Sequence, residues 1–238
     1  MDFHVIIPAR YDSTRLHGKV LLDIGGKPML QHVYERAKDS GAISVTIATD
    51  HIDIAKVAES FGAAVCMTSS EHASGTERIT EVAEALELDD DEVVVCLQAD
   101  EPLISPHIIK NLANDLLDLP NMKVASCCEP IKSAADLFDR NVVKVVMNKR
   151  HHVIYFSRAT VPWDRDQFAQ ESAAKLQAGQ YFRHVGIYAY RIGFLNTYVE
   201  WPPCALEKIE MLEQLRILYN GIRIHMRVLD KSVPRGVD

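Results

Sequence analysis

The fold is decided by the segment SVTIATDHIDIAKVAESFGAAVCM, residues 44–67. Residues 44–49 are mostly β-branched or apolar and predict a buried strand. Apolar residues at helical spacing over 52–61 predict a helix that ends at Gly62, and the short apolar run 64–67 predicts a second strand. This order is typical of a parallel sheet, because parallel strands need a crossover connection.

The same alternation extends to both sides of this segment. Residues 4–8 predict a first strand, and Pro28 opens a helical pattern that ends at Gly41. Further along, the pattern predicts a helix, a strand and a helix over 76–86, 93–97 and 106–117. The sequence therefore predicts an α/β fold, Rossmann-like and doubly wound, with a mostly parallel sheet.

The second half departs from this alternation. Strand-like runs at 142–147 and 153–157 flank a polar turn and predict an antiparallel hairpin insertion. Residues 163–180 are polar and predict a loop, residues 181–191 predict a strand, and a helix is expected over 205–219. No Gly/Ser-rich or Pro-rich linker interrupts the chain, so we expect a single α/β domain.

Composition excludes several classes of protein. The 238 residues are 47% hydrophobic and 25% charged, which allows a large core. The formal net charge of −7 opposes general binding to nucleic acid or to an anionic membrane. No signal peptide or membrane-spanning run is recognisable, so we expect a cytoplasmic protein.

The cysteines offer little chemistry. The sequence holds Cys66, Cys96, Cys127, Cys128 and Cys204. Their number is odd, they lack C-x-x-C spacing, and most lie in apolar strand-like runs, so we interpret them as reduced core residues. A catalytic thiol is the less favoured alternative, because none lies beside a Gly-rich turn or an evident base.

A cationic loop follows the first predicted strand. It carries Arg10, Arg15 and Lys19, and ligands of open α/β sheets bind beyond the carboxyl ends of the strands. The loop is therefore placed to hold a triphosphate, although solvated surface cations are the alternative. Neither a standard P-loop nor the Rossmann glycine fingerprint occurs.

Asp100 follows a buried predicted strand, in the sequence Gln-Ala-Asp-Glu-Pro. Pro102 prevents the strand from simply continuing, which places a carboxylate at its C-terminal end. Mg²⁺ prefers oxygen ligands and often uses one or two carboxylates together with substrate phosphates. Asp100 is therefore a candidate magnesium ligand, and a turn-forming Asp is the alternative.

Two further charged residues have alternative interpretations. Arg78 lies at a predicted helix start, where it could read the polar edge of a base or form a surface ion pair. On the helix predicted over 205–219, the helical wheel places Glu213 in an apolar stripe with Ile209. That carboxylate needs either a structural pair with Arg216 or a polar ligand.

Six segments together resemble one family. They are ARYDSTRLHGK at 9–19, SSEHASGTER at 69–78, LQADEPL at 97–103, YFSR at 155–158, HVGIYAY at 184–190 and LEQLR at 212–216. They resemble the 3-deoxy-manno-octulosonate (Kdo) cytidylyltransferases, or CMP-Kdo synthetases, among the sugar nucleotidyltransferases. The segments occur in the order of that family across nearly the whole chain.

The resemblance implies a nucleotide-diphospho-sugar transferase-like fold and an activity. The expected reaction transfers CMP from CTP to the anomeric hydroxyl of Kdo, gives CMP-Kdo and pyrophosphate for lipopolysaccharide synthesis, and needs Mg²⁺. Alternatives are an 8-amino-Kdo or another CMP-sugar-acid synthetase and, from a different class, a non-catalytic CTP-binding regulatory protein. CTP and Kdo are the expected partners, the chain is expected to be a homodimer, and neither nucleic acid nor a membrane is expected.

The resemblance also assigns site residues. Lys19, Arg10, Arg15 and Asp100 are the expected catalytic residues. CTP is expected to contact Ala9, Arg10, Ser13, Arg15, Lys19, Ser74, Arg78 and Gln98. Kdo is expected to contact Arg158, Arg165, His184, Tyr188, Glu213 and Gln214. Asp100 and Asp238 are the expected metal ligands.

Two details complete the prediction. The chain departs from the family pattern at His17, where proline is usual, and at Ala99, where glycine is usual. Within the domain 1–238, we expect residues 1–130 mainly to bind CTP and 131–204 to form the sugar-binding and dimerisation insertion. Residues 205–238 should supply a helix and a strand that return to the cleft.

Overall fold

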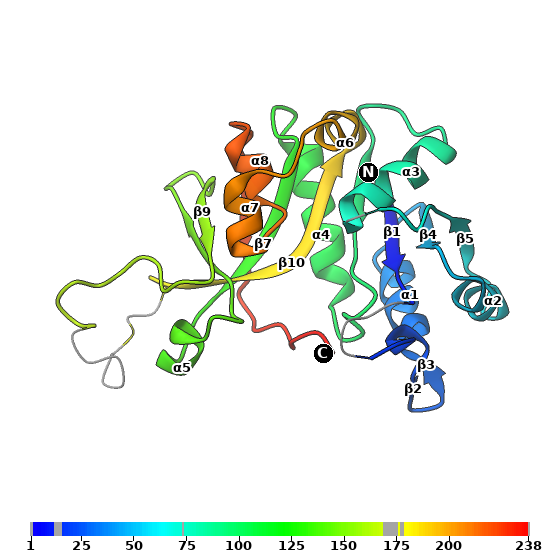
Figure 1. Ribbon diagram of the computed structural model, residues 1–238, viewed down its shortest axis with the longest axis horizontal. Helices are drawn as coiled ribbons and strands as arrows, with labels where there is room; N and C mark the ends of the chain where they lie inside the picture. Colours follow the sequence, from blue (N-terminus) through cyan, green and yellow to red (C-terminus); the bar gives the residue numbers. More distant parts are fainter. Residues whose placement is uncertain (1, 12–15, 73, 169–175, 177–178, 238) are drawn as a thin grey trace. The chain divides into compact units, whose positions relative to one another are not determined.

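The computed structural model describes residues 2–11, 16–72, 74–168, 176 and 179–237 (Figure 1). The chain divides into two compact units. Unit 1 comprises Met1–Val124, Ile187–Glu200 and Val233–Asp238, and unit 2 comprises Ala125–Gly186 and Trp201–Ser232. Each unit is described by itself.

Unit 1 contains the predicted parallel sheet. Its strands run in the order β10–β6–β1–β4–β5, namely β10 (Phe182–Arg191), β6 (Val93–Cys96), β1 (His4–Ala9), β4 (Ser44–Thr49) and β5 (Ala64–Met67). Strand β1 pairs in parallel with β4 and with β6, and β4 pairs in parallel with β5. The end of β10 pairs antiparallel with β6. Every residue of β1 is buried, as expected for a strand with both faces covered.

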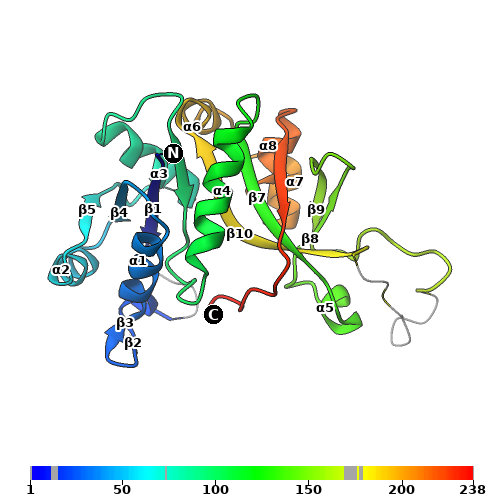
Figure 2. The same ribbon diagram turned by 180° about the vertical axis from the view of Figure 1, so that it is seen from behind.

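Helices cover this sheet in the doubly wound manner. They are α1 (Met29–Asp39), α2 (Ile52–Ser60), α3 (Gly75–Ala85), α4 (Pro106–Asp118) and α6 (Ile192–Val199). Helix α1 packs against α4, and Figure 2 shows the two side by side, while α3 packs against α6 and against β1. A short helix η1 (Lys19–Leu21) and a small hairpin of β2 (Asp23–Ile24) and β3 (Lys27–Pro28) connect β1 to α1. The predicted fold class is confirmed.

Unit 2 contains the predicted antiparallel hairpin. Strand β8 (Lys144–Met147) pairs antiparallel with β9 (Val153–Ser157), and β8 also pairs with β10. The remaining elements are β7 (Val124–Pro130), α5 (Ala134–Phe138), α7 (Ala205–Glu210), α8 (Leu215–Tyr219) and β11 (Ile224–Val228). The sheet order here is β11–β7–β10. Strand β7 and helices α5 and α6 are not predicted from the sequence.

The single helix predicted over 205–219 is wrong. The structure has two short helices, α7 and α8, because Met211 adopts a left-handed backbone with φ 52° and ψ 50°. The amide of Leu212 then donates to the carbonyl of Glu207, which closes the end of α7. The apolar stripe that the helical wheel predicts for this helix is also wrong, since Ile209 is 79% exposed.

No helix among the described residues is long and apolar enough to cross a membrane. The predicted loop over 163–180 falls partly on residues outside the described ranges. Its described residues belong to no helix or strand. That part of the prediction agrees with the structure.

An Ile→Ala substitution should destabilise the protein more at a buried position in β1 than at an exposed position in α2. Ile6 is fully buried, so Ile6→Ala should lower the free energy of unfolding by about 2 to 5 kcal/mol. The matched variant Ile52→Ala, at a residue 56% exposed at the start of α2, should lower it by less than about 1 kcal/mol. Urea denaturation measures both, and equal effects would contradict the burial of β1.

Candidate active site

Lys19 and Asp100 are brought together in unit 1. The Nζ atom of Lys19, at the start of η1, lies 3.1 Å from Oδ2 of Asp100, which follows β6. The same ammonium donates to the carbonyl of Val237 over 2.8 Å. The Lys19 side chain is only 13% exposed, so its charge is directed at this contact instead of at bulk solvent. Two predicted catalytic residues therefore meet at the carboxyl end of the sheet.

The C-terminal segment joins the same contact. The amide of Val237 donates to the carbonyl of Asp100 over 2.9 Å. A Cβ atom on Gly236 would lie 3.0 Å from a carboxylate oxygen of Glu101 and 3.1 Å from the carbonyl of Asp100, so only glycine fits without a shift. Asp238 lies outside the described residues, but it directly follows the residue that is bonded to Asp100.

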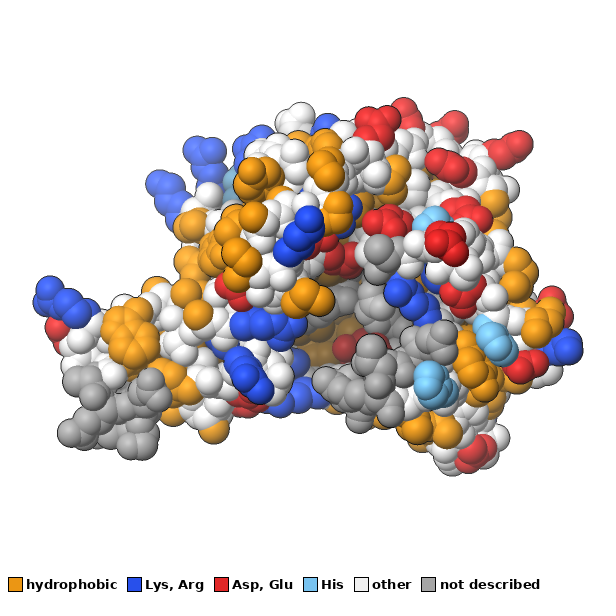
Figure 3. All heavy atoms as spheres, in the orientation of Figure 1, with side chains coloured by type: hydrophobic (Ala, Val, Ile, Leu, Met, Phe, Trp, Pro, Cys, Tyr) orange, Lys and Arg blue, Asp and Glu red, His pale blue; other side chains and the backbone are white. Residues whose placement is uncertain are grey.

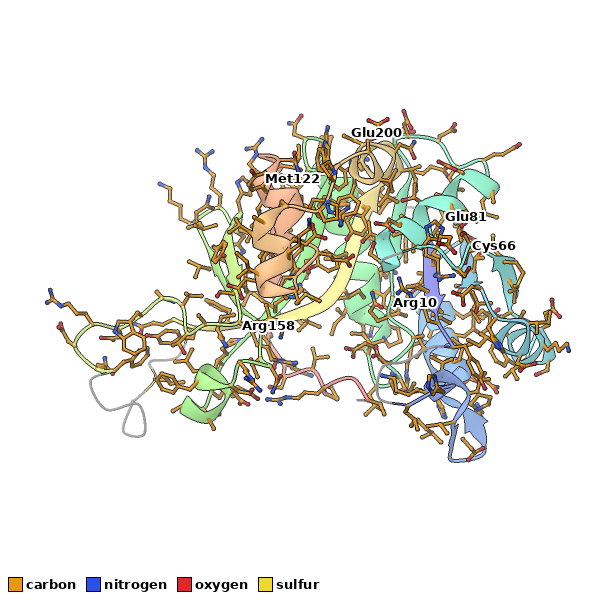
Figure 4. The ribbon with its side chains drawn as sticks, viewed as in Figure 1. Arg10, Cys66, Glu81, Met122, Arg158 and Glu200 are labelled. Carbon is orange, nitrogen blue, oxygen red and sulfur yellow. The ribbon has the colours of Figure 1, made fainter. Side chains whose placement is uncertain are left out.

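Other predicted CTP residues occupy the ends of β1 and β6 and the start of α3. Arg10 directly follows β1 and is half-buried (Figure 4). Ser74 caps α3 by accepting a hydrogen bond from the amide of Glu77 over 3.2 Å. A Cβ atom on Gly75 would lie 3.4 Å from the side-chain amide of Gln98, so glycine allows this amide to approach the helix start.

Of the CTP candidates Ala9, Ser13 and Arg15, the structure describes only Ala9. Ala9 is buried as the last residue of β1. Ser13 and Arg15 lie outside the described residues. Ala99, which departs from the family pattern, is also buried, so its methyl group is accommodated beside Asp100.

Arg78 is not on the surface. Its side chain is 1% exposed, and its guanidinium binds the Asp50 carboxylate over 2.8 Å and the hydroxyl of Thr68. Asp50 follows β4 and Thr68 follows β5, so the guanidinium ties two strand ends to α3. The surface ion pair considered from the sequence is replaced by a buried one. A role in reading the base stays a prediction.

Sequence reasoning misses the partners of this cluster. Asp50 and Thr68 bind Arg78, and the rings of Tyr11 and His51 stack with their centroids 3.9 Å apart. All four residues lie just beyond the end of a strand, and this position is the one sequence signal that could have identified them. The amide of Gly18 donates to the carbonyl of Tyr11, so the stacked ring belongs to the cationic loop.

Arg158 lies in unit 2, directly after β9 (Figure 4). Its guanidinium donates to three backbone carbonyls, those of Glu210, Met211 and Arg140. The contact from Nε to the Glu210 carbonyl is the shortest, at 2.7 Å. Neutral carbonyls hold the group without cancelling its charge, so the cation is available to an anion.

His184 lies in the unit 2 part of β10. Its Nε2 atom lies 2.9 Å from the hydroxyl of Ser126, and its ring meets Phe156 edge-on with centroids 4.9 Å apart. Burial, with a smaller contribution from the nearby Arg183 charge, lowers the pKa of His184 to about 3. The ring is therefore neutral at ordinary pH and can recognise a ligand by hydrogen bonding but not by charge.

The other predicted sugar residues vary in setting. Gln214 is buried and Glu213 half-buried, just beyond the turn at Met211. Arg216, the structural partner considered for Glu213, binds Glu207 through Nε over 2.8 Å. Arg165 has a 90% exposed side chain and pairs with its neighbour Asp166.

Tyr188 belongs to the unit 1 part of β10. It is buried, and its ring stacks on that of Tyr190 with the centroids 5.7 Å apart. This placement sets it apart from Arg158 and His184, which belong to unit 2. A contact with the sugar stays a prediction for Tyr188, as it does for the unit 2 candidates.

The cysteines are free of disulfides, and all except the half-buried Cys66 are buried. Burial raises the pKa of the Cys128 thiol to about 12 and also raises the pKa of Cys66. Neither is an activated nucleophile, because nucleophilic cysteines have depressed pKa values. The prediction of unbridged cysteines in the core holds for all but the partly exposed Cys66.

Comparison with known proteins decides the family. The Cytidylyltransferase family model matches residues 4–224. The chain belongs to the cytidylyltransferase family. It is therefore a nucleotidyltransferase enzyme, as the resemblance in the sequence predicts.

Individual relatives agree with this assignment. The chain is 58% identical over 238 residues to a 3-deoxy-manno-octulosonate cytidylyltransferase of Coxiella burnetii (strain Dugway 5J108-111), covering all of this chain and 95% of that protein. It is 54% identical over 241 residues to the protein of the same name in Haemophilus influenzae (strain PittEE), covering all of this chain and 94% of that protein.

A solved structure extends the similarity to three dimensions. The structure of CMP:2-keto-3-deoxy-manno-octonic acid synthetase complexed with CTP matches with a TM-score of 0.90 and 40% identity, over all of this chain and 93% of the other. A cytidylyltransferase from Leptospira borgpetersenii matches with a TM-score of 0.59 and 16% identity, over 97% of this chain and 77% of that one. The second match concerns the fold alone.

The low pKa of His184 predicts an acid-dependent loss of stability. The unfolded ring takes up a proton near pH 6.5, whereas the folded ring does so only near pH 3. Between these values the unfolded chain binds more protons, so stability falls as the pH falls. From pH 7 to pH 5, the wild type should lose about 2 kcal/mol more than His184→Gln.

Urea denaturation of both proteins at pH 7, 6 and 5 measures this difference. The glutamine retains a group that can hydrogen-bond Ser126, so the comparison isolates the proton. Parallel stability curves for the two proteins would show that the His184 ring titrates normally in the folded state.

Proposed function

We propose that this enzyme transfers CMP from CTP to the anomeric hydroxyl of Kdo, giving CMP-Kdo and pyrophosphate. The observation that carries the proposal is the contact of Lys19 with Asp100 and Val237, in a chain 58% identical to a 3-deoxy-manno-octulosonate cytidylyltransferase. A cation and a carboxylate at the carboxyl end of a parallel sheet suit a polyphosphate and its counter-ion. We further propose that the product serves lipopolysaccharide synthesis.

Unit 1 is proposed to bind CTP. Lys19, Arg10 and Arg15 would neutralise the triphosphate, so that the anomeric oxygen can attack the α-phosphorus in line and pyrophosphate can leave. No covalent enzyme intermediate is needed, since the sugar hydroxyl is itself the nucleophile. The remaining CTP contacts are assigned to Ala9, Ser13, Ser74, Arg78 and Gln98.

Unit 2 is proposed to bind the sugar acid. Arg158 suits the sugar carboxylate because its guanidinium is held by neutral carbonyls. His184 suits a hydroxyl because its ring is neutral. Within unit 2, Glu213 and Gln214 are assigned to the sugar hydroxyls, and Arg165 is a further proposed Kdo contact. Tyr188, which belongs to unit 1, is proposed separately as a Kdo contact.

A divalent metal is proposed at the Asp100 carboxylate of unit 1. Cytidylyltransferases commonly use one, and we propose Mg²⁺ held by Asp100 and Asp238. The described residues contain no cluster of three or more potential metal-ligating side chains. Mg²⁺ commonly takes its other ligands from substrate phosphates and water. Bound there, Mg²⁺ would neutralise charge on the phosphates. Lys19 holds the Asp100 carboxylate in place.

Assembly and location are part of the proposal. Unit 2 exposes the apolar side chains of Ile154 on β9, of Leu206 and Ile209 on α7, and of Met211 just after α7. Figure 3 shows hydrophobic spheres gathered over this part of the molecule. Such a patch is typical of a protein interface, and we propose a homodimer formed through it. We propose the cytoplasm as location because CTP is supplied there.

Pyrophosphate release tests the activity. The purified protein with Mg²⁺ is offered CTP, UTP, ATP or GTP, together with Kdo, 8-amino-Kdo or sialic acid. Release that depends on CTP and Kdo supports the proposal. Preference for 8-amino-Kdo would retain the chemistry and change the substrate, and CTP binding without release for any acceptor would indicate a binding protein.

Loss of the Lys19 charge should abolish most of this activity. Lys19→Met should lower kcat/KM at least about 100-fold, because a preorganised cation at the triphosphate is lost. The matched variant Lys27→Met removes a half-buried lysine that pairs with Glu35 and should retain kcat/KM within about twofold. Circular dichroism checks both folds, and near-normal turnover of Lys19→Met would remove this residue from the scheme.

The proposed dimer makes its own prediction. Ile209→Glu places a charge in the apolar patch and should raise the dimer dissociation constant at least tenfold. Ile43→Glu, at a comparably apolar exposed residue of unit 1, should leave it unchanged. Sedimentation velocity over a concentration series measures both, and identical behaviour of the two variants would place the interface elsewhere.

A further inference from the structure

The end of β9 and the end of α7 are joined by hydrogen bonds in both directions within unit 2. The Glu210 carboxylate accepts from the hydroxyl of Ser157 over 2.6 Å and from the backbone amide of Arg158 over 2.9 Å. In return, Nε of Arg158 donates to the Glu210 carbonyl over 2.7 Å, and Nη2 donates to the Met211 carbonyl. We call these contacts of Glu210 the β9–α7 clasp.

Local structure explains why the clasp forms here. Helix α7 ends at Glu210, and the last carbonyls of a helix lack partners within the helix. A guanidinium at this end satisfies them and interacts favourably with the helix dipole. The amide of Arg158 likewise follows the last residue of β9 and needs an acceptor, which the carboxylate supplies.

A second group holds Arg158 from its other side. Lys144 is fully buried, and its ammonium donates to the carbonyl of Arg158 over 2.6 Å. It also donates to the carbonyls of Asp139 and Val142. The backbone of residue 158 is therefore fixed at its amide by Glu210 and at its carbonyl by Lys144.

The clasp keeps the charge of Arg158 uncancelled. One oxygen of the Glu210 carboxylate accepts from the hydroxyl of Ser157, the last residue of β9, and the other accepts from the amide of Arg158, the next residue, instead of from its guanidinium. Within the described part of the chain, no ion pair involves Arg158. A cation fixed in place by neutral carbonyls is preorganised for an incoming carboxylate, and little side-chain entropy is lost on binding.

We propose that Glu210 is a positioning residue, which sets Arg158 for the carboxylate of the sugar acid. The inference rests on the proposed function and adds a residue to it, since Glu210 itself need not touch the substrate. The clasp also fixes the turn at Met211, two residues before Glu213. One carboxylate thereby orients two parts of the proposed sugar site that lie more than 50 residues apart in sequence.

Steady-state kinetics of Glu210→Ala and Glu210→Gln test this role. Alanine removes both acceptor oxygens, so the KM for Kdo should rise at least tenfold while the KM for CTP stays within twofold. Glutamine retains one acceptor oxygen for the Arg158 amide, so the KM for Kdo should rise less than threefold. The matched control Glu200→Gln, at an exposed glutamate at the end of α6 (Figure 4), should change neither constant.

Two outcomes for Glu210→Ala would overturn the role. One is an unchanged KM for Kdo in Glu210→Ala, and the other is a parallel rise in both KM values, which indicates general loss of structure. If Glu210→Ala does not fold, Ser157→Ala removes one partner of the carboxylate, and the KM for Kdo alone should then rise about threefold. Absence of that rise would equally overturn the role.

Direct binding separates this inference from the proposed function. Calorimetric titration with Kdo needs no turnover, and Glu210→Ala should bind Kdo at least tenfold more weakly than the wild type. A wild type that binds Kdo but releases no pyrophosphate from CTP would contradict the proposed function alone. An active wild type whose Glu210→Ala variant binds Kdo equally well would contradict the positioning role alone, and a wild type that binds no Kdo would contradict both.

Discussion

The pairing of β1 with β4 on one side and β6 on the other is the constraint on which unit 1 depends. Because these strands are parallel and in register, their carboxyl ends lie along one edge. Lys19, reached through the loop after β1, can therefore meet Asp100, which follows β6, although 81 residues separate them. Backbone pairing thus places two charges together before any ligand is present.

Unit 2 builds its candidate site differently. There, Arg158 is placed by hydrogen bonds to the end of α7 and to Lys144. The three partners of its guanidinium are all backbone carbonyls. A site of this kind depends on where a helix ends, so the left-handed turn at Met211 matters as much as any side chain.

Much of unit 1 could be predicted from the sequence because its signals are local. The strands 44–49 and 64–67 are found as predicted, since apolar β-type runs bounded by Gly62 and by polar turns leave few alternatives. Lys19 and Asp100 are predictable for a related reason. Lys19 follows the loop after β1, and Asp100 lies shortly after β6. Their mutual contact agrees with that prediction.

The rest depends on contacts that the sequence pattern does not reveal. The break after α7 is missed because the residue with the left-handed backbone is Met211, whereas glycine is the usual sequence signal for such a helix end. Glu210 is missed because the partners of its carboxylate lie at the end of β9 and just after it, more than 50 residues away in sequence. Arg78 is found, but its buried pair with Asp50 requires three elements to converge.

The burial of Lys144 has a consequence for chemical labelling. Its ammonium is enclosed and held by three carbonyls, while many other lysines of the chain lie on the surface. An amine-reactive reagent must therefore modify surface lysines first and can reach Lys144 only after unit 2 opens. The extent of labelling at this one side chain is a built-in measure of how often that opening occurs.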